Sequence, residues 1–500
     1  MNAPLPSRLE PATTPGGQPF LLAGEESRGL LLALLLAVTA IRIIGLAVSN
    51  AELYYDEAQY WVWAQDPAFG YYTKPPLIAW LIAATTSVCG DSPFCVRLPS
   101  PILHLAISLV IYAIAEKLHS RRVAFWAALV YAVMPGTSIS SILMSTDVPL
   151  LFFWSLALLA LIYHVERPSL ATGLALGLSI GLGINAKYAM LFFFAGWAVF
   201  VIASRQALVS LKHPGTWLAL GVSLALVAPN LLWNAEHQFA TFTHTRENAG
   251  WNGNFPNFLG LLAFLGTQIA IIGPVPFAAF LYAFHRRPEG FRPESRRLLI
   301  SISLSVFALI SAQALISKAN GNWAATGFPA AVVLAASTMV VMRWRRGMVA
   351  TMIISVVALV GIAFSGLLAG TITSGPIGQE LGKMVGWSDL AAKVRSLAEA
   401  QGVKTVVVMS RGLTASMIYE LRGSGLDVRS YVTDPAHPAD HFEMTRPWSP
   451  TDKGPVLMVY VGTWPPPAEV ARRAKLVEQF HTDVFLARGY DRTASAYRLD

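Results

Sequence analysis

Apolar runs of about 20 residues, repeated along the chain, constrain its fold more than any other feature. A helix that crosses a bilayer needs about 20 apolar residues in a row, and such runs recur from residue 28 to residue 370. Hydrophobic residues make up 54% of the 500 residues, and charged residues only 13%. The sequence therefore predicts a polytopic α-helical membrane protein.

We expect about 11 transmembrane helices on this length criterion. They are predicted near 28–49, 95–117, 122–142, 147–165, 170–184, 188–204, 216–233, 257–283, 297–316, 324–342 and 348–370. The apolar run 75–88 is too short and too polar at its flanks to span, so we expect interfacial helices in this first outer loop. Residues 1–26 are polar and contain Pro and Gly, which predicts a disordered segment. They lack the pattern of a cleaved signal peptide, so the first apolar run should remain as an anchor.

The distribution of Lys and Arg predicts the orientation. Basic loops at 119–122, 166–167, 205–212, 285–297 and 343–346 should be cytoplasmic, together with the N-terminus. The other loops, at 56–74, 145–147, 185–188, 229–248 and 317–323, should face the periplasm. The net charge of +8 is then explained by loops near anionic lipid, and it does not indicate nucleic-acid binding.

Residues 371–500 have ordinary charge density and no spanning run, which predicts a periplasmic α/β domain after a membrane region at 27–370. Strand-like runs occur at 404–409, 456–461 and 483–486. Amphipathic stretches lie between them, at 415–421 and 468–480.

Two adjacent carboxylates, Asp56 and Glu57, follow the first apolar run, and Lys74 comes 18 residues after Asp56. Carboxylates this close to a membrane are costly unless they have a function or face water. An enzyme site on the outer face has no access to cytoplasmic nucleotide sugars, so its donor would be a sugar on a lipid phosphate. Transfer from such a donor needs a carboxylate to take the acceptor's proton and cations to stabilise the departing phosphate.

These requirements assign candidate roles. We predict Asp56 as the catalytic base and Glu57 and Asp147 as contacts for the acceptor or a metal ion. The candidate cations for the donor phosphate are Lys74, Arg97, Lys187, Arg246 and Lys318.

In these segments the chain resembles the polyprenyl-phosphate-sugar-dependent glycosyltransferases of the GT-C class. It is most similar to glycosyltransferase family 39, the protein-mannosyltransferase-like group, which is related to the lipid A aminoarabinose transferases. The matching segments are 55–60, 74–80, 96–100, 145–150, 186–188, 229–237 and 322–329. Within or beside them lie the predicted substrate-groove residues Tyr55, Tyr60, Tyr72, Tyr188, Trp233, His237 and Asn322.

The resemblance implies an inverting transfer with Asp56 as base and Lys74 near the donor phosphate. It implies a polyprenyl-phosphate-linked sugar as donor and a glycolipid or glycan acceptor, such as lipid A or lipopolysaccharide core. The aminoarabinose transferases have a metal-binding Glu directly before their Lys-Pro-Pro, whereas this chain has Thr73. A divalent metal ion is therefore left open.

Structural interpretations of the same residues also stand. Asp56 and Glu57 suit a helix cap or a solvated loop, and Asp147 suits a helix N-terminus. Lys74, Arg97 and Lys187 suit anchors to lipid headgroups, and the aromatic residues suit an interfacial belt. Cys89 and Cys95 both lie on the predicted outer side, where a disulfide and two buried thiols are both open.

Other functions compete with a monosaccharide transferase. A flippase or transporter of lipid-linked sugars would also be polytopic, but it would more often show midplane charges and two-half symmetry. A protein hydroxyl acceptor, or another GT-C activity such as a glycan polymerase or ligase, is a further alternative.

Overall fold

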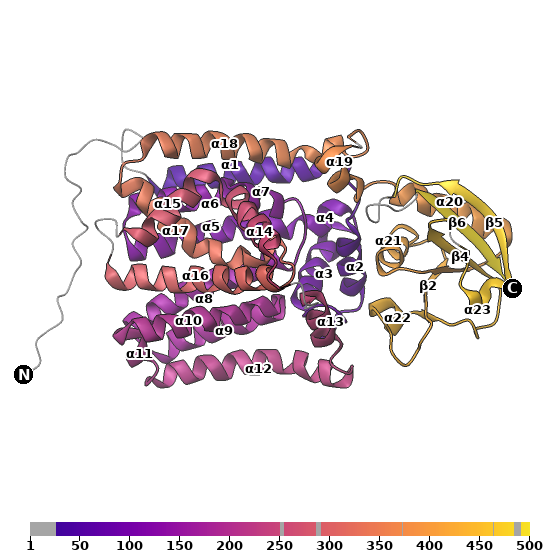
Figure 1. Ribbon diagram of the computed structural model, residues 1–500, viewed down its shortest axis with the longest axis horizontal. Coiled ribbons are helices and arrows are strands. Elements are labelled where there is room, and N and C mark those ends of the chain that lie inside the picture. The colour runs from indigo at the N-terminus through magenta and orange to yellow at the C-terminus, as the bar shows by residue number, and fades with distance from the viewer. Residues whose placement is uncertain (1–26, 251–254, 287–291, 373, 464, 485–491) are drawn as a thin grey trace, which may run out of the picture.

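The computed structural model describes residues 27–250, 255–286, 292–372, 374–463, 465–484 and 492–500. Figure 1 shows two parts, a block of helices and, at one end of that block, a sheet with its own helices. The expectation that residues 1–26 are disordered and cytoplasmic lies outside the described residues.

Seven helices of the described residues are long and apolar enough to cross a membrane. They are α1 (Arg28–Ala47), α4 with α5 (Pro93–Arg97 and Pro99–Leu118), α8 (Asp147–Glu166), α12 (Pro214–Glu236), α16 (Pro293–Ile316), η2 with α17 (Gly321–Gly327 and Phe328–Val341) and α18 (Arg345–Ala363). This shows a polytopic helical membrane protein, and these helices match predicted spans.

The other predicted spans are shorter or broken helices. They are α6 with α7 (Arg121–Val133 and Pro135–Ser140), α9 (Leu170–Ala186), η1 with α10 (Tyr188–Leu191 and Phe192–Ala203), and α14 with α15 (Phe258–Ile272 and Pro274–His285). The last pair bends by 108°, at Gly273 with φ of +92° and the proline that begins α15. The count of 11 therefore stays a prediction.

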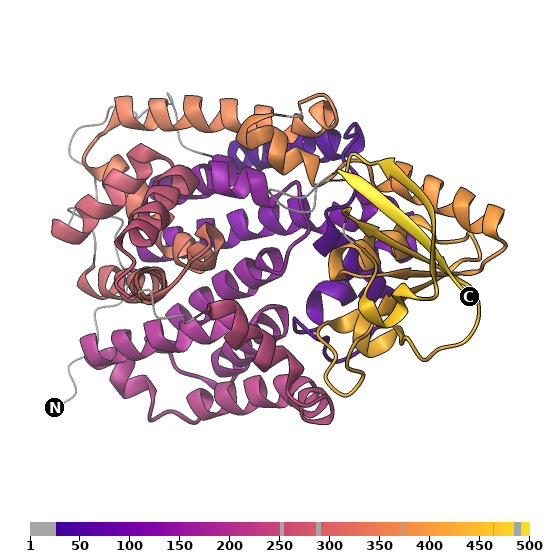
Figure 2. The same cartoon turned by 45° about the vertical axis from the view of Figure 1, so that its right-hand side comes forward.

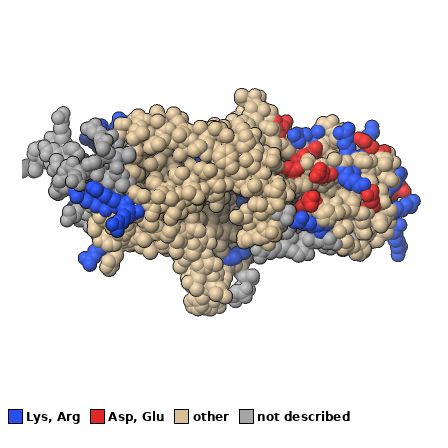
Figure 3. Space-filling model, turned by 90° about the horizontal axis from the view of Figure 1, so that it is seen from above, with Lys and Arg blue, Asp and Glu red and all other residues tan. Residues whose placement is uncertain are grey.

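Charge divides the molecule as the loop pattern predicts. Figure 3 shows a broad central band with few charged side chains, Lys and Arg at one end, and mixed charges on the C-terminal part. Helix α11 (Arg205–Ser210), in the basic loop 205–212, lies at the end of the block opposite the sheet (Figure 1). The basic loops and the C-terminal part thus lie at opposite ends of the spanning helices.

Short helices connect the block to the sheet. These are α2 (Tyr55–Gln65), α3 (Leu77–Cys89), α4 and α13 (Ala240–Ala249). Helix α3 confirms that the run 75–88 is helical, while its place at a membrane interface stays a prediction. A disulfide joins Cys89 at the end of α3 to Cys95 in α4, which settles the alternatives left open for these two cysteines.

The C-terminal part contains a six-stranded sheet in the order β3-β2-β1-β4-β6-β5. The strands β1 (Thr405–Val408), β2 (Asp427–Tyr431), β3 (Pro447–Trp448) and β4 (Val456–Val461) are parallel, whereas β6 (Thr493–Leu499) pairs antiparallel with both β4 and β5 (Ala474–His481). Its helices are α19 (Gly375–Gly382), α20 (Trp387–Gln401), α21 (Arg411–Glu420), α22 (His441–Thr445) and α23 (Ala468–Ala471). The predicted α/β character is confirmed, as are the strands at 404–409 and 456–461.

Two local predictions in this part are wrong. The stretch 468–480 is not one amphipathic helix, because α23 ends at Ala471 and residues from Ala474 form strand β5. Pairing with β6 satisfies the backbone of β5, and this long-range contact overrides the local helical pattern. The run 483–486 was predicted as a strand, but Asp483 and Val484 are not in one, and residues 485–486 lie outside the described residues.

The C-terminal part packs on α2 through a shared apolar core. Trp61 and Trp63 of α2, Ala415 and Tyr419 of α21, and Phe442 of α22 are all buried in it. Figure 2 shows the indigo helices of the first outer loop against this orange and yellow region. Gly412 permits close contact, since a Cβ there would lie 3.3 Å from the Tyr55 ring. Helix α2 is therefore held from both sides, by the helical block and by the C-terminal part.

Candidate active site

Asp56 lies in the first turn of α2, where the helix dipole favours a negative charge. Its Oδ1 accepts a hydrogen bond from Arg411 Nη1 at 2.8 Å. The Asp56 side chain is 35% exposed to solvent, and its Oδ2 bonds to no residue within the described ranges. Asp56 is thus anchored at one oxygen and open to a substrate at the other.

Arg411 is the site residue that sequence reasoning missed. It is the first residue of α21, in the C-terminal part, and its Nη1 also donates to Gln59 Oε1 at 2.6 Å. The guanidinium lies 5.5 Å from the centre of the Tyr55 ring, within cation–π range. Burial alone would lower the pKa of Arg411, but the charge of Asp56 and its hydrogen bond raise that pKa above the usual value. In the sequence this residue is one arginine among many, 355 positions after Asp56.

Glu57 occupies a different environment, although it is the next residue. It forms a buried ion pair with Arg97, with 2.7 Å between Oε2 and Nη2 and only 3% exposure of either side chain. The backbone N–H groups of Tyr54 and Met144 also donate to its carboxylate. Arg97 in turn donates to the carbonyl oxygens of Ala51 and Glu52. Both charges are satisfied by protein groups, which favours a structural role for the pair.

Asp147 and Lys187 form a further ion pair, whose side chains are more exposed than those of Glu57 and Arg97. The Lys187 ammonium lies 2.7 Å from Asp147 Oδ1, and Asn322 Nδ2 donates to Oδ2 at 2.7 Å. Asp147 begins α8, Lys187 follows α9, and Asn322 belongs to η2. Three predicted site residues from distant parts of the sequence therefore meet at one point.

Lys74 is a cation without an anionic partner in the described part of the chain. Burial, together with the smaller effect of the positive charges of Lys187 and Arg411, lowers its pKa to about 8, while Asp56 and Asp147 act in the opposite direction. Because all these charges act on Lys74, the two carboxylates and their cations belong to one electrostatic cluster. An ammonium that is largely desolvated and unpaired is prepared to bind an anion.

Tyr60 and His244 also belong to this cluster. Tyr60 lies one turn after Asp56 and is buried; burial and the charge of Asp56 raise its pKa well above the usual value. Burial lowers the pKa of His244, and Lys74 and Arg411 lower it further. His244 is therefore in the electrostatic field of the same cations.

The residues predicted to line an aromatic groove make ordered contacts with one another and with their neighbours. Tyr188 donates to Asn230 Oδ1 at 2.6 Å, and its ring stacks on Phe242. The Trp233 and His237 rings stack with 4.0 Å between their centres. The hydroxyl of Tyr72 donates to the carbonyl oxygen of Pro438, in the C-terminal part. No sugar contact is assigned to these residues, so their groove role stays a prediction.

Two predicted phosphate-binding cations lie apart from these pairs. Arg246 in α13 and Lys318 after α16 are both exposed. Neither forms an ion pair with any residue that the structure describes. Their role in donor binding stays a prediction.

The described residues contain no group of three or more His, Cys, Asp or Glu side chains that could hold a metal ion. Each carboxylate of the site is instead engaged by a cation: Asp56 by Arg411, Glu57 by Arg97 and Asp147 by Lys187. These residues therefore do not form a metal donor set.

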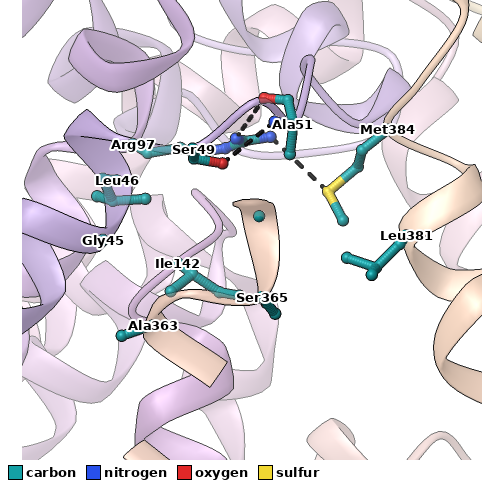
Figure 4. A pocket seen from close by; sticks show the side chains of 11 residues that line it. Gly45, Leu46, Ser49, Ala51, Arg97, Ile142, Ala363, Ser365, Leu381 and Met384 are labelled. Atoms are coloured by element: carbon teal, nitrogen blue, oxygen red, sulfur yellow. Dashed lines mark hydrogen bonds between the residues drawn. The ribbon is translucent and has the colours of Figure 1, made fainter. Parts of the chain in front are cut away.

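A small pocket lies beside the buried Glu57–Arg97 pair. Figure 4 shows Arg97 in its wall, together with residues from the end of α1, from η3 (Ser365–Leu368) and from α19. Arg97 is its one charged lining residue, and Asp56, Lys74 and Asp147 do not line it. We therefore do not assign the donor to this pocket.

Comparison with known proteins places the chain in a family. A family model described as dolichyl-phosphate-mannose-protein mannosyltransferase matches residues 73–233. The lipid A galacturonosyltransferase RgtD of Rhizobium johnstonii (strain DSM 114642 / LMG 32736 / 3841) is 31% identical over 415 residues, which cover 82% of this chain and 86% of RgtD. The chain belongs to this glycosyltransferase family.

A second curated member of this glycosyltransferase family is similar over a shorter stretch. The lipopolysaccharide core galacturonosyltransferase RgtA of the same organism is 28% identical over 278 residues, 52% of this chain and 53% of RgtA.

The fold of the family recurs in solved structures of ArnT from Cupriavidus metallidurans. The apo structure has a TM-score of 0.63, and the structure bound to undecaprenyl phosphate has a TM-score of 0.66. Both are 15% identical and cover 94% of this chain, and the chain covers 97% and 98% of them. This likeness shows that the predicted GT-C fold is present.

Proposed function

We propose that this protein transfers one sugar, a galacturonosyl residue, from a polyprenyl-phosphate donor to lipid A or lipopolysaccharide core. The observation that carries the proposal is the cluster at the sheet end of the helical block. It combines a partly exposed carboxylate, Asp56, with an unpaired cation, Lys74. The acceptor class and the sugar are supported by RgtD and RgtA, whose names give both. The donor class is supported by the undecaprenyl phosphate in one ArnT structure of the same fold.

In the proposed reaction, Asp56 acts as the general base of an inverting transfer. It takes the proton of the acceptor hydroxyl while the acceptor oxygen attacks the anomeric carbon. The bond between that carbon and the phosphate oxygen breaks, and its electron pair remains on the phosphate. Lys74 stabilises this developing charge. Lys187, oriented by Asp147, is the second cation beside it.

The charge balance of the cluster fits an anionic donor. Among the charges named as acting on Lys74, Lys187 and Arg411 add to its positive charge, and Asp56 and Asp147 oppose it. A polyprenyl-phosphate uronate carries charge both on the phosphate and on the sugar. A cluster with surplus positive charge attracts such a donor more strongly than a neutral one.

We infer that the protein resides in the bacterial inner membrane with its site on the periplasmic side. The basic loops at the opposite end of the helices support this orientation. The Cys89–Cys95 disulfide also supports it, because disulfides persist in oxidising compartments. Residues 27–370 would then be the membrane catalytic domain and residues 371–500 a periplasmic domain, with residues 1–26 in the cytoplasm.

Mass spectrometry of envelope glycolipids tests the proposal. Lipid A and core from a strain that lacks the protein should lose one sugar, which the wild-type gene restores and the Asp56→Asn gene does not. Purified protein should transfer the same sugar from its polyprenyl phosphate to the acceptor. Unchanged glycolipids, or a glycosylated protein in place of a glycolipid, would refute the assignment of the acceptor.

A further inference from the structure

Arg411, the first residue of α21, does not stabilise its own helix. A positive charge in the first turn of a helix opposes the helix dipole and destabilises that helix. Ser410 already caps α21 by accepting the backbone N–H of Leu413. Among the described residues, the guanidinium contacts only α2, through Asp56, Gln59 and the Tyr55 ring. The residue is therefore directed at the first outer loop and not at its own domain.

The docking of the C-terminal part on α2 does not depend on this contact. The Trp61 and Tyr419 rings meet edge to face at 5.0 Å, and the Tyr419 hydroxyl donates to the Asp91 carbonyl. The carboxylate of Glu52 also accepts the backbone N–H groups of Trp387 and Ser388, at the start of α20. A domain held by these contacts can present Arg411 at a fixed position.

The effect of Arg411 on Asp56 is specific to one oxygen. The guanidinium holds Oδ1 at 2.8 Å, and Gln59 fixes the same Nη1 at 2.6 Å. The carboxylate is thereby restrained from rotation, while Oδ2 has no partner within the described chain. A general base must keep one oxygen within hydrogen-bond reach of the proton that it abstracts.

We propose that Arg411 is a positioning residue of the transferase, supplied by the C-terminal domain, which orients Asp56 so that its Oδ2 takes the acceptor proton. The inference rests on the proposed function, and it gives the C-terminal domain a part in catalysis. Sugar transfer proceeds as above, with the proton ending on Oδ2 of Asp56 and the electron pair of the broken bond on the phosphate.

Steady-state kinetics of the full-length protein test this role. Arg411→Ala should lower kcat by about 10- to 100-fold, which is the range expected for the loss of a hydrogen bond between charged groups. The KM for the donor should change little, because Asp56 acts on the acceptor. Arg411→Lys should recover part of kcat, and guanidinium ions below denaturing concentrations should partly restore Arg411→Ala. A purely structural role would not produce such rescue.

Arg422→Ala is the matched control. Arg422 follows the end of α21, and its guanidinium lies 4.0 Å from the Tyr419 ring and 5.9 Å from the Trp61 ring of α2, without an ion pair to Asp56 among the described residues. Its removal should leave kcat within about fivefold, as expected for an exposed cation–π contact. Where Arg411→Ala fails to fold, Arg411→Gln replaces it, since its amide can still bond to Gln59.

The outcomes separate the two proposals. A wild-type protein without transfer activity refutes the proposed function. An active wild-type protein with unchanged kcat in Arg411→Ala or Arg411→Gln refutes only the role of Arg411. A raised donor KM with unchanged kcat would also overturn it, because Arg411 would then bind the donor phosphate.

Discussion

Asp56 and Glu57 are neighbours in the chain, yet the structure treats their carboxylates in opposite ways. Glu57 is 3% exposed and is bonded by Arg97 and by two backbone N–H groups. Asp56 is 35% exposed, holds one arginine and leaves Oδ2 without a partner in the described residues. Asp56 can therefore bind a substrate, whereas Glu57 is committed to the fold.

The origin of the two arginines explains the difference. Arg97 comes from α4, 40 residues after Glu57, and ties the first outer loop to the helical block. Arg411 comes from α21, in the C-terminal part. A buried ion pair is costly to break because it leaves an uncompensated charge, whereas a partly exposed pair can exchange its partner for a ligand. The first pair thus supports the loop on which the second pair operates.

Asp56→Asn gives the largest expected effect on activity. The amide cannot take a proton, so kcat should fall by about 10²- to 10⁴-fold, the usual contribution of a general base. The fold should persist, since an amide still accepts from Arg411. Transfer is measured with a polyprenyl-phosphate sugar, and folding by the thermal midpoint in detergent. Normal transfer by a folded Asp56→Asn protein would remove Asp56 from the mechanism.

Glu57→Gln should act on stability instead. Loss of one member of a buried ion pair costs about 3–5 kcal/mol, so the thermal midpoint and the yield of folded protein should fall. The activity per folded molecule should remain close to that of the wild type. The double variant Glu57→Gln, Arg97→Gln should be less destabilised than the sum of the two single variants, because neither charge is then left alone. A stable Glu57→Gln protein that has lost activity would reverse the comparison.

The sequence predicted the parts of this site that are encoded locally. Asp56 and Lys74 lie in one short loop between apolar runs, and charge-based topology grouped them with Asp147 and Lys187, whose charges act on Lys74 in the structure. It could not distinguish Asp56 from Glu57, because burial is decided by partners 40 and 355 residues away. The strand β5 was missed for the same reason, since its partner β6 comes later in the chain and overrides the local pattern.

The cations Lys74 and Arg97 differ in the same way as the two carboxylates. Arg97 is bonded to Glu57 and to two carbonyl oxygens, whereas Lys74 has no anionic partner in the described chain. Its pKa of about 8 means that it is protonated at neutral pH and loses its charge as the pH rises through about 8. The value of kcat/KM for the donor should therefore fall across that range, since this parameter reports ionisation in the free enzyme. Lys74→Ala should lower it by about 10- to 100-fold at neutral pH.

Lys74→Arg is the control for this pH dependence. Its guanidinium stays charged, so the alkaline decline should disappear even where the substitution reduces the rate. A decline that persists unchanged in Lys74→Arg would belong to another group and would contradict the assignment of Lys74.

Arg246 and Lys318 should give the smallest effects, because both are exposed and lack ion-pair partners in the described chain. As outer cations they would attract the donor phosphate through solvent, and such interactions are largely screened beyond about 8 Å at physiological ionic strength. Replacing both by Ala should lower kcat/KM for the donor by about two- to threefold at low salt, consistent with weak surface electrostatics. The difference should vanish at high salt, whereas the defect of Lys74→Ala should remain because its site is desolvated. A defect of Arg246→Ala or Lys318→Ala that resists salt would show direct contact with the donor, and it would place these cations beside Lys74 in the site.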